Sequence, residues 1–146
     1  MTLFTIGYEG RDIEEYLELL KRNMVKLVID VRRNPISRKR GFSKTRMREA
    51  LSNEGIDYIH FPQLGIESER RKGLKNRSDY LSLFSWYEEE VLIREHDTLM
   101  EIISILNESD RIALTCYEAD FTFCHRSRVS NMLSEIAESE LDLVHL

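Results

Sequence analysis

The amino-acid sequence predicts a single-domain α/β fold, a three-layer sandwich with a mostly parallel sheet, over residues 1–146. Short apolar runs rich in branched side chains alternate with stretches of helical periodicity, which is typical of a parallel sheet covered by helices on both faces. A chain of 146 residues is long enough for one domain with a full core. No internal repeat, low-complexity segment or linker divides it, so we expect one unit.

The first half of the chain predicts three strands and two helices. Strands are expected at residues 2–8, 25–31 and 56–61, where branched and aromatic residues cluster between turn signals. Residues 12–23 place their apolar side chains on one helical face, and Asp12 stands in the position of an N-cap. A second helix is expected over residues 43–53, with a serine at its start and a glycine beyond its end.

The second half is expected to alternate in the same way, after a long charged loop. Residues 64–78 carry many charges without periodicity, and loops of this length are often functional. A helical pattern follows over residues 79–109, with one break near residues 94–97. A strand at 111–117, a helix at 126–139 and a last strand at 141–146 complete the expected order.

The composition is that of a soluble globular protein, which we expect in the cytoplasm. Hydrophobic residues make up 42% of the chain and charged residues 32%, a balance that argues against disorder. No apolar run approaches the roughly 20 residues that span a bilayer, and the N-terminus lacks the basic and apolar regions of a signal peptide. The two cysteines are too few for a disulfide framework. We therefore expect no membrane partner.

Charge is segregated along the chain, although the net charge is only −5. Residues 1–78 carry 17 Lys and Arg against 11 Asp and Glu, whereas residues 79–146 carry 4 against 15. The stretch Arg32–Arg48 holds eight basic residues and no acidic one. Such a block attracts nucleic acid, a nucleotide phosphate, or the acidic half of the same protein, either within one molecule or across a homodimer.

Polar side chains follow four of the expected strands, at the edge where parallel α/β sheets bind their ligands. They are Tyr8 and Arg11 after the first strand, Asp30 and Arg32 after the second, His60 after the third, and Cys116 and Glu118 in and after the strand at 111–117. Because the carboxyl ends of parallel strands meet at one edge, we expect these side chains to converge. Glu118 is the best candidate for a general acid or base.

Cys124, His125 and Arg126 stand where a helix is expected to begin. Free N–H groups at a helix start, together with nearby cations, lower a thiol pKa and bind anions. Cys124 is therefore a candidate nucleophile, and His125 and Arg126 are candidate anion-binding residues. Cys124 as an ordinary core residue, a disulfide with Cys116, and a metal site of both cysteines with His125 and His60 remain open. The spacing matches no zinc knuckle, and adjacent Cys and His rarely point at one ion, so we expect no metal.

Four stretches of the sequence, in this order, resemble the DUF488 family of small α/β proteins. They are TIGYEGRDIEEYLELLKRN, LVIDVRRNPISRKRGFSK, GIDYIHFPQLG and ALTCYEADFTFCHRSRVSNML. The most specific element is the Cys-x-Glu and Cys-His-Arg pair between Cys116 and Arg126, and the second is DVRRNPIS. Tyr8 and Glu9 stand where the family commonly carries histidine and serine. The resemblance implies the α/β fold and a site at these motifs, but no reaction, since the family's function is not established.

Other cysteine and nucleotide motifs do not fit this chain. A weaker similarity to the rhodanese-like fold rests on the IDVR strand and a cysteine loop before a helix. In those enzymes, and in cysteine phosphatases, the thiol opens a short loop that an arginine closes. Here nine residues separate Cys116 from Arg126 and one separates Cys124 from it, so that cradle cannot form. The turn between Gly7 and Gly10 is too short for a dinucleotide fingerprint, and we expect no nicotinamide or flavin cofactor.

The leading functional hypothesis is an enzyme, or a protein derived from one, that acts on a phosphorylated or nucleotide-like small anion. In this hypothesis Arg32 and Arg126 hold the negative charge, and Cys124 or Glu118 is the reactive group, with Cys116 and Asp30 as further catalytic candidates. The alternative is a non-catalytic module that contacts nucleic-acid phosphates through residues 32–48.

Overall fold

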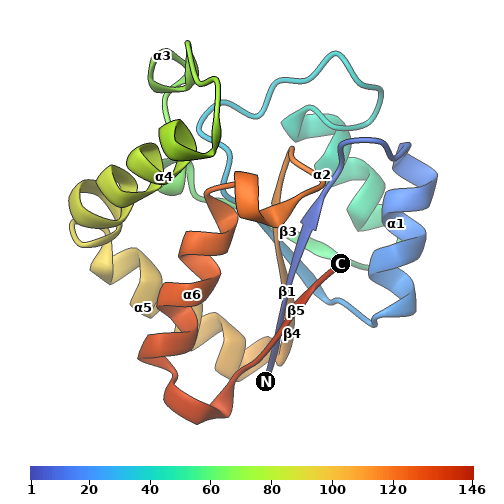
Figure 1. Ribbon diagram of the computed structural model, residues 1–146. Coiled ribbons are helices and arrows are strands. Elements are labelled where there is room, and N and C mark those ends of the chain that lie inside the picture. Colours follow the sequence, from blue (N-terminus) through green and yellow to red (C-terminus); the bar gives the residue numbers. More distant parts are fainter.

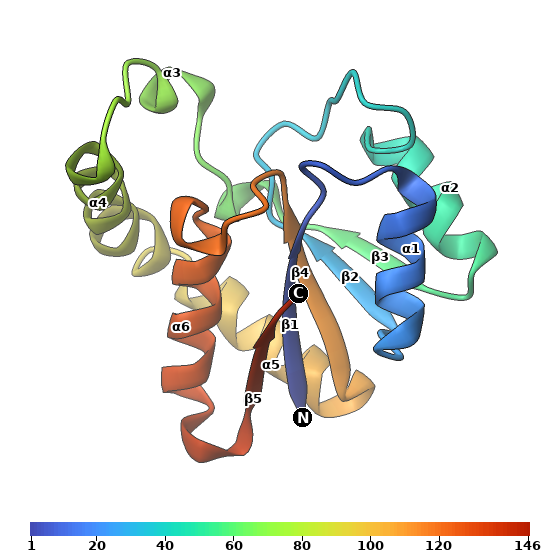
Figure 2. The ribbon, with the colours of Figure 1, turned by 45° about the vertical axis from the view of Figure 1, so that its right-hand side comes forward.

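A five-stranded parallel sheet forms the middle layer of the protein. The computed structural model describes residues 1–146, except for the side chain of Ser139. Its strands are β1 (Thr2–Gly7), β2 (Leu27–Asp30), β3 (Asp57–His60), β4 (Arg111–Cys116) and β5 (Asp142–His145). Figure 1 shows the whole fold, in which the strands lie in the order β3-β2-β4-β1-β5 and every neighbouring pair is parallel (all five are labelled in Figure 2). All five strands therefore end at the same edge of the sheet.

Helices cover both faces of this sheet (Figure 2). Helices α1 (Ile13–Arg22) and α2 (Lys44–Asn53) lie on one face. The other face is covered by α4 (Arg77–Trp86), α5 (His96–Ser109) and α6 (Arg126–Ile136), while the short α3 (Ser68–Arg71) lies towards the edge where the strands end. The arrangement confirms the predicted α/β fold with helices on both sides of a parallel sheet.

The core lies in two parts, one on each face of the sheet. In β2, Leu27 and Ile29 pack in the part that also contains residues of α5 and α6, whereas Val28 packs in the part that contains residues of α1 and α2. The sequence of a strand that is buried on both faces is a continuous run of apolar residues. This double burial is the reason that β2 could be predicted from the sequence.

Two predicted helix starts have different local chemistry. The Asp12 side chain accepts the backbone N–H of Glu15 at 2.8 Å, while Glu15 accepts the N–H of Asp12 at 3.2 Å, which is a complete capping box. Ser43 precedes α2 as expected, but its hydroxyl makes no bond to that helix. It accepts the N–H of Ser37 at 2.9 Å and donates to the Ser37 carbonyl at 3.0 Å. Ser43 therefore closes the basic loop that follows β2.

The predicted helix over residues 79–109 is divided in two, and the predicted break is confirmed. Helix α4 continues into a π-helical segment at Tyr87–Leu92, and residues 93–95 form a turn before α5. The Tyr87 hydroxyl donates to the Leu64 carbonyl, and its ring packs edge-on against His125 with centroids 5.5 Å apart. Among the described residues, no helix is long and apolar enough to cross a bilayer.

Two glycines allow loops to cross closely where the strands end. A Cβ on Gly7 would lie 1.9 Å from the carbonyl oxygen of Glu118, and a Cβ on Gly65 would lie 2.2 Å from the backbone nitrogen of Arg33. No side chain fits at either crossing. The backbone segments that carry Glu118 and Arg33 are therefore held directly against their neighbours.

We expect Gly7→Ala to destabilise the protein more than Gly10→Ala. The added Cβ at Gly7 has no room beside the Glu118 carbonyl, and overpacking of this kind costs about 3 kcal/mol. Gly10 has a φ of 77° but nothing within 4 Å of an added Cβ, so its substitution should cost only about 1 kcal/mol of backbone strain. Urea unfolding of both variants measures the difference, and equal losses would contradict a tight crossing at Gly7.

The attachment of β5 is expected to weaken in acid, because it depends on a neutral His145. Thr5 Oγ1 and His145 Nδ1 lie 2.6 Å apart, and the imidazole stacks on Phe121. Partial burial lowers the pKa of His145, and the positive charge of Arg126 adds to the effect. The folded state therefore binds fewer protons than the unfolded state, so the free energy of unfolding should fall as the pH drops through the folded pKa.

Urea unfolding between about pH 7 and about pH 5 tests this expectation, because the range brackets an ordinary histidine pKa. The control is His145→Gln, which cannot titrate and should lose less stability over the same range. An identical loss in wild type and variant would rule out His145 as the source.

Candidate functional site

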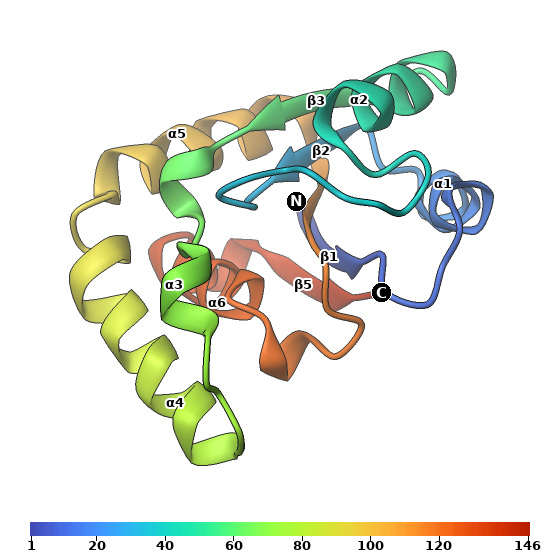
Figure 3. The same ribbon diagram turned by 90° about the horizontal axis from the view of Figure 1, so that it is seen from above.

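Chemically reactive side chains gather over the edge where the strands end. Figure 3 looks onto this edge, with the loops after β2 and β4 lying over it and α3 at one side. Cys116 ends β4, Glu118 follows it, and Cys124 and His125 directly precede α6. Arg71 reaches the same place from the end of α3 and forms an ion pair with Glu118. We call these five residues the thiol cluster.

The two thiols and the imidazole of the thiol cluster lie close together. Cys116 Sγ is 3.9 Å from His125 Nδ1, and the two sulfurs and an imidazole nitrogen all lie within 4.8 Å of one another. All three side chains are about 1% exposed, and both cysteines are free. A turn at Phe121–Phe123 returns the chain from the end of β4 to the position of Cys124. The turn is closed by a hydrogen bond in which the Phe121 carbonyl accepts the Cys124 N–H at 3.1 Å.

Hydrogen bonds determine the orientation and the tautomer of His125. Its Nε2 lies 2.8 Å from the carbonyl oxygen of Val31, which can only accept, so Nε2 carries the proton. Its Nδ1 lies 3.0 Å from Nη2 of Arg71, which can only donate. The lone pair on Nδ1 therefore faces Arg71 and the Cys116 sulfur.

Arg71 links the carboxylate of the cluster to its imidazole. Besides its bond to His125, Arg71 places Nη1 3.4 Å from Oε1 of Glu118. The other carboxylate oxygen of Glu118, Oε2, is buried and has no hydrogen-bond partner. Buried polar atoms are almost always paired in folded proteins. Glu118 therefore keeps one acceptor atom free inside the site.

The two thiols have opposite pKa shifts. A hydrogen bond from Cys124 lowers the pKa of Cys116 well below its usual value against the opposing effect of burial, and the positive charge of Arg71 lowers it further. Burial raises the pKa of Cys124, and the neighbouring Cys116 raises it further. Burial likewise raises the pKa of Glu118. These shifts favour deprotonation of Cys116 over Cys124, whereas the position of Cys124 before a helix favoured Cys124 from the sequence. Cys124 is completely buried, and its own N–H already binds within the turn.

Asp30 and Arg32 form a second group, which holds the basic loop in place. Arg32 Nε lies 2.9 Å from Oδ1 of Asp30, and Nη2 lies 2.7 Å from Oδ2. Nη1 of Arg32 donates to the Phe42 carbonyl at 2.6 Å, and Tyr58 donates to Asp30 at 2.6 Å. Arg32 is only 5% exposed, so its guanidinium binds protein atoms from the loop that it supports.

The remaining residues predicted for the site also bind parts of the protein. The Tyr8 hydroxyl lies 3.2 Å from Arg32 Nη1, His60 Nε2 lies 2.7 Å from the Arg32 carbonyl, and Arg11 donates to the Gly7 carbonyl at 2.6 Å. Arg126 is fully buried and donates to the backbone carbonyls of Glu118 and Ala119. Four predicted residues, Cys116, Glu118, Cys124 and His125, thus lie together, and the others support the loops around them.

A polar hollow opens beside Cys116, between the loop after β2 and α3. It is lined by Arg32, Arg33, Asn34, Ile66, Ser68, Arg71, Cys116 and Tyr117. Arg33 enters from the first loop with 48% of its side chain exposed, and its ion pair with Glu67 is long at 3.8 Å. Arg71 enters from the opposite side. We call this space the Arg33–Arg71 hollow.

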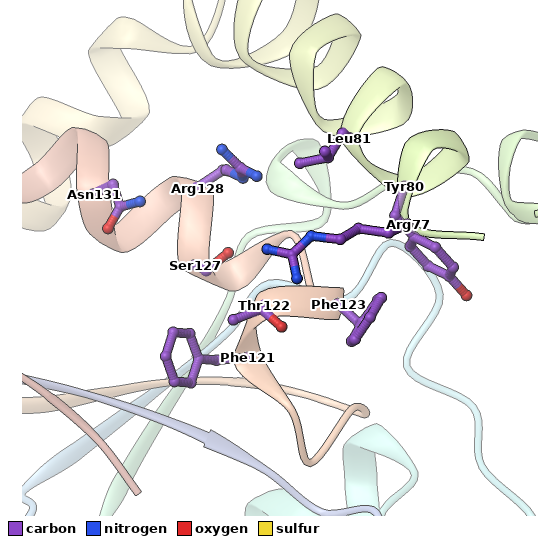
Figure 4. A pocket seen from close by; sticks show the side chains of 9 residues that line it. All are labelled: Arg77, Tyr80, Leu81, Phe121, Thr122, Phe123, Ser127, Arg128 and Asn131. Atoms are coloured by element: carbon purple, nitrogen blue, oxygen red, sulfur yellow. The ribbon is translucent and has the colours of Figure 1, made fainter.

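Two further hollows follow on the other side of Arg71. The nearer one is lined by Arg71, Leu74, Tyr80, Leu83, Phe84, Glu118, Phe123 and His125. The rings of Tyr80 and Phe123, 5.2 Å apart, also line a larger hollow of about 200 Å³ between α4 and α6 (Figure 4). No thiol, imidazole or carboxylate lines that larger hollow. The reactive groups therefore belong to the thiol cluster and the spaces next to it.

Sequence reasoning did not identify Arg33, Arg71 or Tyr87 as site residues. Arg71 lies far from Cys116 in the chain, and the spacing of the charged loop gives no sign of which cation reaches the sheet edge. Arg33 stands next to Arg32, and two adjacent arginines look alike in a sequence. Only their burial and partners distinguish Arg32, which is buried and supports the loop, from Arg33, which is half exposed with one long ion pair.

The arrangement offers two kinds of chemistry. A thiolate beside an imidazole and a carboxyl group can carry out nucleophilic and acid–base steps. Two sulfurs and an imidazole nitrogen at one point are also the ligands that Zn²⁺ prefers. Both possibilities use the thiol cluster and not the Asp30–Arg32 pair.

The matches to known proteins bear on the same motifs. A family model described as "Domain of unknown function DUF488" matches residues 12–133. A search of curated proteins and a search of solved structures give no match. The matched range contains the whole thiol cluster and both loops that border the Arg33–Arg71 hollow. The chain therefore belongs to the DUF488 family, as the motifs around Cys116 and Cys124 predicted.

Proposed function

We propose that this protein is an enzyme that acts on a small phosphorylated or nucleotide-like anion, bound in the Arg33–Arg71 hollow. The observation that carries the proposal is the meeting of Arg33, from the loop after β2, and Arg71, from the end of α3, beside Cys116 and Glu118. Guanidinium groups bind phosphate oxygens through paired hydrogen bonds. An anion between Arg33 and Arg71 would lie directly beside the reactive groups of the cluster.

The surroundings of the two arginines support binding of an anion. Arg33 is half exposed with a weak ion pair, so little has to be broken before it can bind a ligand. Asn34 and Ser68 add an amide and a hydroxyl to the lining. The backbone of Arg33 packs directly against Gly65 and is held in place there. Less conformational entropy is therefore lost when Arg33 binds an anion.

Glu118 is the residue that we assign to proton transfer. Its free Oε2 can hold or accept a proton, while the bond from Arg71 to Oε1 orients the carboxyl group. Cys116 lines the hollow and Cys124 does not, so Cys116 is the sulfur that a bound anion would meet.

Arg33→Gln and Arg71→Gln should each weaken anion binding about tenfold, the cost of losing one charged hydrogen-bond donor. Inorganic phosphate, pyrophosphate and ADP are suitable probes, and thermal stabilisation at increasing concentrations measures their affinity. Arg46→Gln is the matched control, because Arg46 is an exposed arginine of the basic stretch and, among the described side chains, pairs with Glu49 alone. An equal loss in Arg46→Gln would contradict binding in the hollow.

Glu118→Gln should bind the same anion but fail to convert it, because the amide keeps the shape of the carboxyl group and cannot exchange its proton. Mass spectrometry of a panel of phosphorylated compounds, incubated with wild type or variant, detects the products. Conversion at the same rate by wild type and variant would contradict the role of Glu118. If the wild type binds the anions but converts none of them, the proposal that this protein is an enzyme is contradicted.

A second function, nucleic-acid binding, is favoured by one observation. Arg38, Arg40, Arg46 and Arg48 are all exposed along the stretch 32–48, where Arg32 itself is buried. Exposed arginines of this kind contact phosphates without reading the sequence. If this function is the correct one, the combined change of Arg38, Arg40 and Arg46 to Gln should lower the slope of log affinity against log salt by about three, one for each lost phosphate contact. An unchanged slope would rule it out.

A further inference from the structure

We propose that Cys116, Cys124 and His125 form a binding site for Zn²⁺, with both sulfurs and Nδ1 of His125 as ligands. The inference goes beyond the proposed function and does not depend on it. It rests on the positions of three buried side chains and on the hydrogen bonds that orient them.

The distances within the cluster suit one tetrahedral ion. With Zn–S bonds of about 2.3 Å and Zn–N bonds of about 2.0 Å, neighbouring ligand atoms in a tetrahedral site lie about 3.5–4 Å apart. Cys116 Sγ and His125 Nδ1 are 3.9 Å apart, and the two sulfurs and an imidazole nitrogen lie within 4.8 Å of one another. Shifts of less than an ångström would therefore bring all three atoms onto one ion.

The imidazole of His125 is already prepared as a ligand. A metal-binding histidine usually donates its other N–H to a carbonyl or carboxylate, which fixes the ring and its tautomer. His125 Nε2 does this to the Val31 carbonyl at 2.8 Å, and the lone pair of Nδ1 points into the cluster. The edge of the Tyr87 ring restricts rotation of the imidazole.

Sequence spacing argued against this site, because adjacent Cys and His side chains rarely reach one ion. The structure contains the exception. Cys124 ends the turn at Phe121–Phe123 in an extended conformation, with φ −129° and ψ 138°, whereas His125 is already helical, with φ −62° and ψ −20°. The change in backbone direction between the two residues turns both side chains to the same side. His60, considered with them in the sequence, is bound instead to the Arg32 carbonyl.

Three protein ligands leave one position open, as in catalytic zinc sites. Glu118 lies beside this group, with an oxygen that is buried and unpaired. Zn²⁺ with two sulfurs and one histidine, next to a glutamate that is not a ligand, is the ligand set that zinc deaminases use to activate water. The ligand chemistry therefore matches that of a hydrolytic site.

Arg71 competes with the metal in the metal-free protein. Its Nη2 donates to the same Nδ1 lone pair that would bind Zn²⁺, at 3.0 Å. A guanidinium at this distance also repels a divalent cation. Arg71 lies at the end of the short α3, outside the sheet and the long helices, so it can move away when the ion binds. Removing the Arg71 charge should therefore strengthen zinc binding.

The test uses the full-length chain, kept reduced and stripped of metal with a chelator. Zn²⁺ alone is titrated in competition with a chromogenic chelator, and Co²⁺ alone is titrated by absorption spectroscopy. We expect one ion per chain and, with Co²⁺, a sulfur-to-metal charge-transfer band together with the strong visible bands of tetrahedral coordination. Absence of stoichiometric binding, or cobalt binding without the charge-transfer band, would overturn the proposal.

Variants assign the ligands. Cys116→Ser, Cys124→Ser and His125→Gln should each weaken zinc binding at least about 100-fold, beyond the roughly 10–100-fold cost of removing an outer-shell partner. The Gln amide can still donate to the Val31 carbonyl, so this variant removes the ligand while keeping the hydrogen bond. His96→Gln, on the exposed surface of α5, should bind zinc as the wild type does. Equal affinity of any one ligand variant and the wild type would refute the assignment.

Arg71→Gln separates this inference from the proposed function, because it should raise zinc affinity about tenfold and lower phosphate affinity. A purely structural role of Arg71 would lower both. Weaker zinc binding in Arg71→Gln would contradict the claim that Arg71 competes with Zn²⁺ for Nδ1 of His125. When each ligand is titrated in the absence of the other, Arg33→Gln should change only the anion affinity, and Cys124→Ser, at a position that does not line the Arg33–Arg71 hollow, should change only the zinc affinity. Failure of one proposal is thus visible while the other stands.

Discussion

The hydrogen bond from His125 Nε2 to the Val31 carbonyl joins the start of α6 to the end of β2. It orders the site because it decides which imidazole nitrogen carries the proton and where the other one points. Cys116 comes to the same place through the pairing of β4 with β1 and β2, which sets its position along the sheet. The thiol cluster thus depends on one side-chain hydrogen bond and on the register of a parallel sheet.

Buried arginines in this protein bind other protein atoms, whereas the partly exposed Arg33 and Arg71 are the two that we propose bind an anion. Arg32 and Arg126 are desolvated, and a desolvated charge is costly unless most of its donors are paired. Asp30 and the Phe42 carbonyl pair with Arg32, and the carbonyls of Glu118 and Ala119 pair with two nitrogens of Arg126, whose buried Nε has no partner among the described residues. Removal of either arginine would leave its partners unsatisfied. Loss of activity in such variants would therefore carry no information about anion binding.

Most of the fold could be predicted from the sequence because its signals are local. The Asp12 capping box and the apolar run of β2 are read within a few residues. Part of the site was equally accessible, since Cys116 ends a strand, Glu118 follows that strand, and His125 precedes a helix. Arg71 was not, because its place depends on how the charged loop folds back over the sheet. The pKa order of the two thiols also needed the structure, since the burial of Cys124 and its contact with Cys116, which raise the pKa of Cys124, cannot be read from the sequence.

Arg71 connects the two halves of the site through electrostatics. In the metal-free protein it is the only cation paired with Glu118 among the described residues, and it also holds the imidazole lone pair. A divalent ion on the sulfurs would supply positive charge at that point and make the guanidinium unnecessary there. The released guanidinium borders the Arg33–Arg71 hollow, where an anion would bind it. Occupation of the cluster by metal should therefore favour occupation of the hollow by anion, and by thermodynamic linkage the anion should tighten metal binding by the same factor.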